Sequence, residues 1–135
     1  MDRFPQRFGK YILLDRIASG GMAEVFRAKV TGAEDFHRLI AIKCILPHLV
    51  EDEEFCRMFI DEAKLASNLS HANISQIYEL GDHAGRLYIG MELISGFNLR
   101  EITRRIQKLG LRMPDSLVAY IISKATEALD YAHQM

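Results

Sequence analysis

The sequence lacks long apolar runs, the pattern of a secretory signal in its first residues and any cluster of cysteines. Its unbroken apolar stretches, such as Leu39 to Ile42, are far shorter than the roughly 20 residues that cross a bilayer. No transmembrane helix is therefore expected. The first residues have neither the basic start nor the apolar stretch of a secretory signal, which makes the cytoplasm the expected location. Cys44 and Cys56 show no metal-ligand spacing, so we expect structural thiols.

The sequence also lacks a charge excess of either sign. Its 135 residues carry 17 Lys and Arg against 18 Asp and Glu, a formal net charge of -1. This balance argues against nucleic acid or a membrane surface as the main partner. Hydrophobic residues make up 49% and charged residues 26%, which is typical of one soluble globular core.

Hydrophobic periodicity predicts an α+β chain in the order three strands, one helix, two strands and two helices. Gly and Pro clusters separate these elements, and Ser95-Gly96 is the expected boundary between a strand-rich half and a helical half. Strands are expected over 11–14, 23–30, 39–46, 74–80 and 87–94, and helices over 52–69, 99–109 and 118–132.

Two charged residues stand in otherwise apolar patterns. Lys43 interrupts a strand in which the other seven of eight residues are apolar, and a buried lysine needs an anion. Glu62 is spaced at helical intervals from Phe59 and Met58, so it projects from an apolar helix face and needs a cation. We infer a Lys43 to Glu62 ion pair. The alternatives are a lysine that snorkels to solvent and a glutamate solvated at the edge of its stripe.

A glycine turn, Ala18-Ser19-Gly20-Gly21-Met22-Ala23, lies between the first two strands. Glycine lets backbone N–H groups approach an anion closely, although a glycine pair between strands is more often a simple hairpin turn. The order of glycine turn, lysine in an apolar strand and carboxylate on the next helix describes a phosphate site whose cation is held by a counter-ion.

These residues resemble the amino-terminal lobe of a bacterial-type Ser/Thr protein kinase. The stretch from Ile17 to Phe26 resembles the glycine-rich loop, Ala41-Ile42-Lys43 resembles the V-A-I-K lysine, and Phe59-Ile60-Asp61-Glu62-Ala63 resembles the stretch supplying the glutamate of the C helix. His71-Ala72-Asn73-Ile74 resembles an H-P-N-I turn, and the stretch from Leu87 to Gly96 resembles the fifth strand and hinge. The resemblance implies a five-stranded antiparallel sheet with the C helix over 1–94, followed over 95–135 by the first two C-lobe helices, D and E.

The resemblance also implies ATP and Mg²⁺ as cofactors and a protein as substrate. The turn Ala18 to Gly21 would approach the phosphates, and Lys43 would contact the α and β phosphates while Glu62 orients it. The remaining expected nucleotide contacts surround the base and the ribose. They are Ile17, Val25 and Ala41 around the adenine, Met91 as gatekeeper, the backbones of Glu92 and Ile94 at the adenine edge, and Asn98 near the ribose.

Three departures qualify the resemblance. Alanines at 18 and 23 replace the first and third glycines of the loop, and Ala72 replaces the usual proline. The sequence contains no H-R-D and no D-F-G motif, so the family's general base and main metal ligands are missing from these residues. We therefore expect that residues 1–135 alone do not phosphorylate a substrate.

Two other functions remain open at this point. One is a non-catalytic half-kinase that docks or dimerises through the apolar stripe of the last helix. The other is an unrelated nucleotide-binding α+β domain, which would need to reproduce the whole ordered set of motifs by chance. The stripe comprises Val118, Ile121, Ile122, Ala125 and Leu129.

Overall fold

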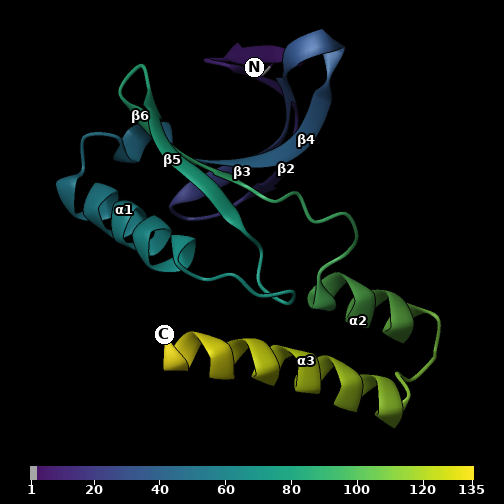
Figure 1. The fold of residues 1–135 in the computed structure, drawn as a ribbon. Coiled ribbons are helices and arrows are strands. Elements are labelled where there is room, and N and C mark those ends of the chain that lie inside the picture. Colours follow the sequence, from purple (N-terminus) through teal and green to yellow (C-terminus); the bar gives the residue numbers. More distant parts are fainter. Residues whose placement is uncertain (1–2) are drawn as a thin grey trace. The chain divides into compact units, whose positions relative to one another are not determined.

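A computed structural model describes residues 3–135, which divide into two compact units. The first unit extends to Ser70 and resumes over Ser75–Leu93, and the second comprises His71–Ile74 and Ile94–Met135. Figure 1 shows the first unit as a curled sheet with one helix and the second as a pair of helices. Among the helices of residues 3–135, none has the length and apolar character that crossing a membrane requires.

The sheet of the first unit has six antiparallel strands in the order β1-β2-β3-β4-β6-β5. This arrangement confirms the predicted α+β class and the antiparallel sheet. Two single 3-10 turns, η1 (Ala33–Asp35) and η2 (Pro47–Leu49), flank β4. The strands are β1 (Gln6–Phe8), β2 (Tyr11–Ser19), β3 (Ala23–Thr31), β4 (His37–Ile45), β5 (Ile77–His83) and β6 (Arg86–Met91).

The sheet contains one strand more than the five expected. The additional strand, β1, is three residues long, so it is too short to show a hydrophobic period, and it pairs with β2 across a turn at Gly9. Gly9 has a φ of 58°, which glycine adopts without steric cost. The strand expected over 74–80 begins later, at Ile77, and Ile74 belongs to the second unit.

Strand β4 separates two apolar cores because its side chains alternate between the two faces of the sheet. Ile40, Ile42 and Cys44 face a core that also contains Phe26 and Tyr11. The other face packs against the helix α1 (Glu53–Ser67). Its core comprises Ala23, Ile45, Leu49, Phe59, Ala63 and Ile89.

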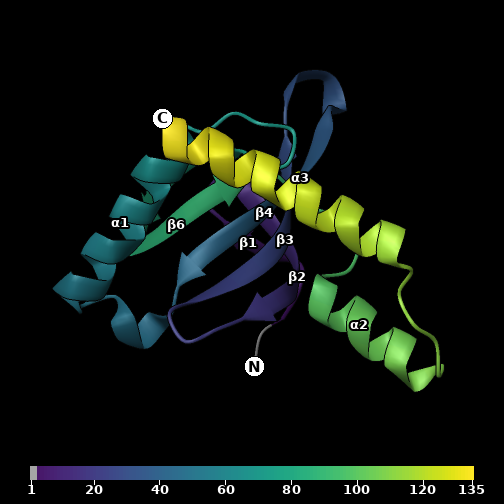
Figure 2. The same ribbon diagram turned by 90° about the horizontal axis from the view of Figure 1, so that it is seen from below.

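Helix α1 begins at an N-cap, where the Asp52 carboxylate accepts hydrogen bonds from the backbone N–H groups of Glu54 and Phe55. Figure 2 shows α1 alongside β6. The buried face of α1 is narrower than the apolar pattern of its sequence predicted. Phe59 and Ala63 are buried, whereas Met58 and Leu65 are exposed, because a helix lying along a sheet contacts it through one stripe only.

The second unit contains two helices, α2 (Leu99–Lys108) and α3 (Asp115–Gln134), which run in opposite directions in both ribbon views (Figures 1 and 2). The segment His71–Ile74 packs against α3. Its Asn73 side chain donates a 3.0 Å hydrogen bond to the backbone carbonyl of Lys124, and the His71 ring lies 5.2 Å from the Tyr131 ring. The H-P-N-I-like turn therefore belongs structurally with the helices.

The burial of Cys44 gives a first testable prediction. Its side chain is fully buried, and this burial raises the pKa of the thiol from 9.0 to about 11. Because the thiolate is the reactive form, a thiol reagent at about pH 8 should label the half-buried Cys56 and spare Cys44 while the chain is folded. Mass spectrometry of the labelled peptides measures this. Equal labelling rates at both positions would contradict the prediction, and labelling of Cys44 in denaturant is the control.

Candidate functional site

Strand register brings several of the predicted site residues into one row across the sheet. Ala18 of β2 pairs with Val25 of β3, which pairs with Lys43 of β4. Two residues along β4, Ala41 pairs with Met91 of β6, so Val25, Ala41, Lys43 and Met91 lie on the same face of the sheet. Residues up to 66 positions apart in sequence thus form one surface beside the glycine turn.

The predicted ion pair between Lys43 and Glu62 is present. Lys43 Nζ lies 2.7 Å from Glu62 Oε1, which joins β4 to α1. The side chains are 26% and 56% exposed, so both the lysine and the glutamate reach water. An ion pair this accessible contributes at most about 1 kcal/mol to stability. Its main consequence is to fix the position of the ammonium group.

A cavity of about 410 Å³ lies between this ion pair and the glycine turn. Neither Gly20 nor Gly21 has a positive φ, and a Cβ atom added at Gly21 would meet nothing within 4 Å. A Cβ at Gly20 would make only an ordinary 3.7 Å contact with the carbonyl of Ala23. The fold itself therefore does not require these two glycines, and their lack of side chains leaves the backbone of the turn open to close approach. The cavity is lined by Ala18, Ser19, Gly20, Gly21, Met22, Ala23, Val25, Lys43, Phe59 and Glu62.

Most of the remaining predicted site residues follow β6 in the sequence, whereas Ile17 lies on β2. Glu92 is held against Gln76, since its N–H donates to the Gln76 carbonyl and its carboxylate accepts from the Gln76 N–H. Its own carbonyl accepts a 3.4 Å hydrogen bond from Ser75 Oγ. Ile17 on β2 is 47% exposed and Ile94 is 64% exposed. Ile94 belongs to the second unit.

Asn98 has a structural role that the sequence reasoning did not include. Its side chain accepts a hydrogen bond from the Glu101 N–H, and the Glu101 carboxylate accepts one from the Asn98 N–H. This capping box starts α2 and uses the side-chain oxygen of Asn98. The side-chain NH2 group of Asn98 takes no part in this capping box and is available to donate a further hydrogen bond.

Sequence reasoning missed a buried charge cluster beside the glycine turn. Glu24 is 8% exposed, and its carboxylate binds Arg86 Nη2 at 2.6 Å and Arg16 Nε at 3.1 Å. Arg86 Nε also donates to the backbone carbonyl of Ile45. A carboxylate within the apolar stretch from Ala23 to Phe26 was a visible signal, but its partner lies 62 residues away. The cluster connects the start of β3 to β6 and β2.

Replacing Glu24 by glutamine should lower the free energy of unfolding by about 1–3 kcal/mol, because the partly buried Arg86 guanidinium then lacks its counter-charge. Chemical denaturation monitored by circular dichroism measures this. Glu53→Gln is the matched control, because Glu53 is exposed. Equal stability of the two variants would contradict a structural role for the Glu24 cluster.

Metal ligands do not cluster in the part of the chain that the structure describes. No group of three or more His, Cys, Asp or Glu side chains in residues 3–135 has an arrangement that could hold a metal ion. The polar residues that line the cavity include Lys43, Glu62 and Ser19, beside the backbone of the glycine turn. A cation beside open backbone suits an anionic ligand such as a nucleotide phosphate.

An antiparallel sheet, a glycine turn between its strands and a lysine–glutamate pair joining the sheet to a helix define the protein kinase class of fold and site. The protein kinase domain family model matches residues 11–135. The chain therefore belongs to the protein kinase family, and the predicted family is confirmed.

The relatives include kinases named for different substrate hydroxyls. The chain is 41% identical over 129 residues to the tyrosine-protein kinase MasK of Myxococcus xanthus, covering 96% of this chain and 20% of MasK. It is 37% identical over 128 residues to the serine/threonine-protein kinase PrkC of Bacillus subtilis, covering 93% of this chain and 18% of PrkC. The sequence spans about one fifth of these relatives.

Solved structures show the same fold. The kinase domain of Mycobacterium tuberculosis PknI superimposes with a TM-score of 0.74 at 26% identity, over 99% of this chain and 52% of the PknI chain. The chain thus corresponds to about half of a bacterial kinase domain. This match confirms the expected N-lobe fold followed by C-lobe helices, with β1 as the sixth strand.

Proposed function

We propose that this chain is the ATP-binding part of a protein serine/threonine kinase, which transfers the γ-phosphoryl group of ATP to a protein hydroxyl. The observation that carries the proposal is the 2.7 Å Lys43–Glu62 pair beside a glycine turn that has no packing need for glycine. Serine/threonine specificity is favoured because PrkC is named a serine/threonine-protein kinase, although MasK is named a tyrosine-protein kinase.

In this proposal, residues 1–94 form the N-lobe and 95–135 the first C-lobe helices. Lys43 binds the α and β phosphates, Glu62 orients Lys43, and the backbone of Gly20 and Gly21 approaches the phosphates. Val25 and Ala41, with Ile17, contact the adenine, and Met91 lies behind it. Mg²⁺ supplies charge neutralisation of the phosphates when bound. Because ATP is the donor, the site works in the cytoplasm.

Nucleotide binding by the 135-residue chain tests the proposal directly. A fluorescent ATP analogue should bind with an increase in anisotropy, and unlabelled ATP should displace it. Adenosine, which lacks phosphates, should displace the analogue much less effectively, because the proposed cation and glycine turn contact phosphate. Equal displacement by ATP and adenosine would refute the phosphate contacts, and no binding of the analogue would refute the nucleotide site.

We also propose that residues 1–135 by themselves do not catalyse phosphoryl transfer. They contain no H-R-D or D-F-G motif, so the base and the main metal ligands of the family are missing from them. Incubation with Mg-ATP and a generic basic protein should give no phosphorylation. Phosphate incorporation that disappears in Lys43→Ala would overturn this proposal.

A second candidate is docking or dimerisation through α3. Val118, Ile122 and Leu129 are 42%, 56% and 54% exposed, which leaves apolar surface uncovered on this helix. Ile121 is half-buried and lines a cavity together with Leu99 and Thr103 of α2, so it contributes less to that surface than the sequence indicated. Light scattering should show a dimer that Ile122→Asp dissociates and Ser123→Asp does not. A monomer at high concentration would exclude dimerisation.

A further inference from the structure

Helix α2 carries a dense group of positive charges on the surface of the second unit. Arg100, Arg104, Arg105 and Lys108 lie within its ten residues, and Glu101 is its one acidic residue. The Glu101 carboxylate is already used in the capping box with Asn98. Within residues 3–135, no acidic side chain forms an ion pair with any of the four cations.

The other acidic residues of the second unit are engaged elsewhere. Asp115 pairs with Arg112 at 3.2 Å, and Glu127 pairs with Lys124 at 3.5 Å. Asp130 accepts a hydrogen bond from Gln134 on the same helix. The positive charge on α2 is therefore not neutralised by its own unit, although the whole chain is nearly neutral.

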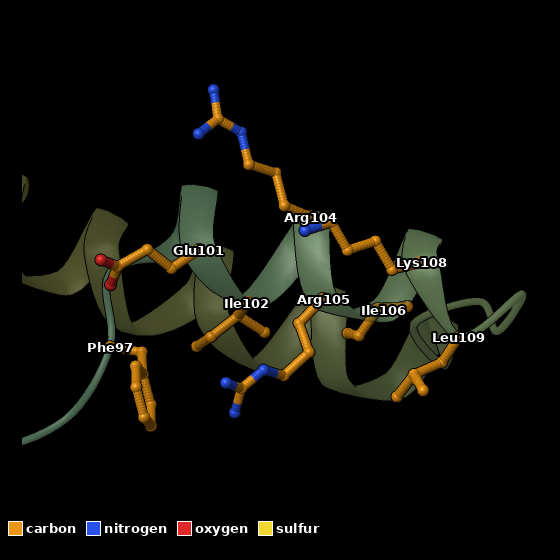
Figure 3. Close-up of a pocket in the computed structure, with 8 residues that line it drawn as sticks. All are labelled: Phe97, Glu101, Ile102, Arg104, Arg105, Ile106, Lys108 and Leu109. Carbon is orange, nitrogen blue, oxygen red and sulfur yellow. The ribbon is translucent and has the colours of Figure 1, made fainter.

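The same surface is concave and partly apolar. A cavity of about 420 Å³ is lined by residues of α2 and its flanks. Phe97 and Leu109 are 67% and 66% exposed, and Ile102 lies between them in Figure 3. Solvent exposure of large apolar side chains inside a basic cavity is unfavourable unless a partner covers them. We call this surface the α2 pocket: Phe97, Glu101, Ile102, Arg104, Arg105, Ile106, Lys108 and Leu109.

Positively charged side chains border the α2 pocket on two sides. The Arg105 guanidinium lies 5.4 Å from the centre of the Phe97 ring, a cation–π contact that limits its freedom without neutralising it. Arg104 and Lys108 are one helical turn apart, and Figure 3 shows Arg104 projecting away from Arg105. The planar fork of an arginine matches a carboxylate with two parallel hydrogen bonds. The pocket thus offers carboxylate-binding groups on two sides of an apolar centre.

We propose that the α2 pocket binds an acidic peptide segment of a partner protein, with an apolar side chain against Ile102 and Leu109 and flanking carboxylates on Arg104, Arg105 and Lys108. Charge complementarity selects an acidic occupant. The concave shape favours a protruding side chain over a flat lipid surface, and the ten-residue helix offers little length for lying in a membrane. This docking surface is independent of the proposed nucleotide site, and its test requires no nucleotide.

The test uses fluorescence anisotropy with a short labelled peptide that has one phenylalanine flanked by glutamates. The 135-residue chain should bind it, and Arg104→Ala combined with Lys108→Ala should weaken binding by at least about tenfold. The matched control is Arg57→Ala combined with Lys64→Ala, which removes two exposed cations from α1 and should leave the affinity unchanged. Equal weakening by both pairs would indicate a general charge effect and overturn the proposal.

A change in the peptide tests the apolar centre without altering the protein. Replacing the phenylalanine of the peptide by serine should weaken binding by about tenfold, because the apolar contact with Ile102 and Leu109 is lost. Unchanged affinity for the serine peptide would overturn the proposal that the α2 pocket binds an apolar side chain. Two further outcomes overturn the proposal. The first is that the folded chain does not bind the glutamate peptide. The second is that the chain binds phosphatidylserine vesicles and this peptide does not compete with that binding.

Discussion

Replacing Lys43 by alanine should lower the affinity of the chain for Mg-ATP roughly 100-fold. Lys43 carries the cation that lines the glycine-turn cavity, and charge-assisted hydrogen bonds to phosphate oxygens are about twice as strong as neutral ones. The fold should be retained, because the Lys43–Glu62 pair is solvent-accessible and contributes at most about 1 kcal/mol to stability. Displacement of a fluorescent ATP analogue measures the affinity, and thermal unfolding measures the stability.

Two comparisons make the Lys43 result specific. Lys29→Ala removes a lysine from the neighbouring strand β3, where it pairs with Leu39, and should leave nucleotide affinity unchanged. Glu62→Gln keeps the Lys43 charge but loses the ion pair, so its effect should lie between those of Lys29→Ala and Lys43→Ala. Equal affinities of the wild-type and Lys43→Ala chains would refute the assignment of Lys43 to the phosphates.

Replacing Phe59 by alanine should lower the free energy of unfolding by about 3–5 kcal/mol. Phe59 is 1% exposed and packs with Ile45 and Ile89 in the core between α1 and the sheet. Proteins of this size have a total stability of about 5–15 kcal/mol, so this loss is a large part of it. Because Phe59 lies one turn before Glu62, loosening α1 should also displace the Lys43–Glu62 pair. Urea denaturation measures the stability.

Leu65→Ala on the same helix is the matched control. Leu65 is 74% exposed, so its truncation removes little buried area and should change stability by less than about 0.5 kcal/mol. If Leu65→Ala were as destabilising as Phe59→Ala, the orientation of α1 on the sheet would be wrong. The pair of variants therefore tests which stripe of α1 faces the core.

The Lys43 and Phe59 variants separate binding from folding. Lys43 lies at a solvent-accessible cavity and should affect nucleotide affinity without unfolding the chain. Phe59 lines the same cavity from the core side and should affect both properties. A loss of nucleotide affinity in Phe59→Ala can therefore be interpreted only together with the measured stability of that variant. A loss of affinity in Lys43→Ala shows a direct effect on ligand binding.

Much of the first unit follows from local pattern. The nearly continuous apolar run around Lys43 predicted the strand that became β4, and the spacing of Phe59 and Ala66 predicted α1. The glycine turn and the two charged residues in apolar patterns, Lys43 and Glu62, together indicated the ion pair that the structure contains. These features are readable because strand and helix periods, turns and anomalous charges depend on residues close in sequence.

Other features depend on contacts between distant residues. The pattern of α1 did not distinguish Phe59, which is buried, from Met58 and Leu65, which are exposed. The buried Glu24 finds Arg86 only after β6 has paired beside β4. Asn98 looked like a ribose contact by family resemblance, but its side chain also caps α2.

The near-neutral charge of the whole chain, which argued against nucleic acid or a membrane surface as the main partner, averages over two units. The sequence alone predicted the family, the order of the elements apart from the short strand β1, and the ion pair between Lys43 and Glu62. Only the tertiary structure decided which apolar residues are buried, which cations remain unpaired on α2 and which strands become neighbours. The physical reason is that hydrophobic periodicity depends on residues close together in sequence, whereas strand pairing and side-chain burial depend on how distant segments pack together.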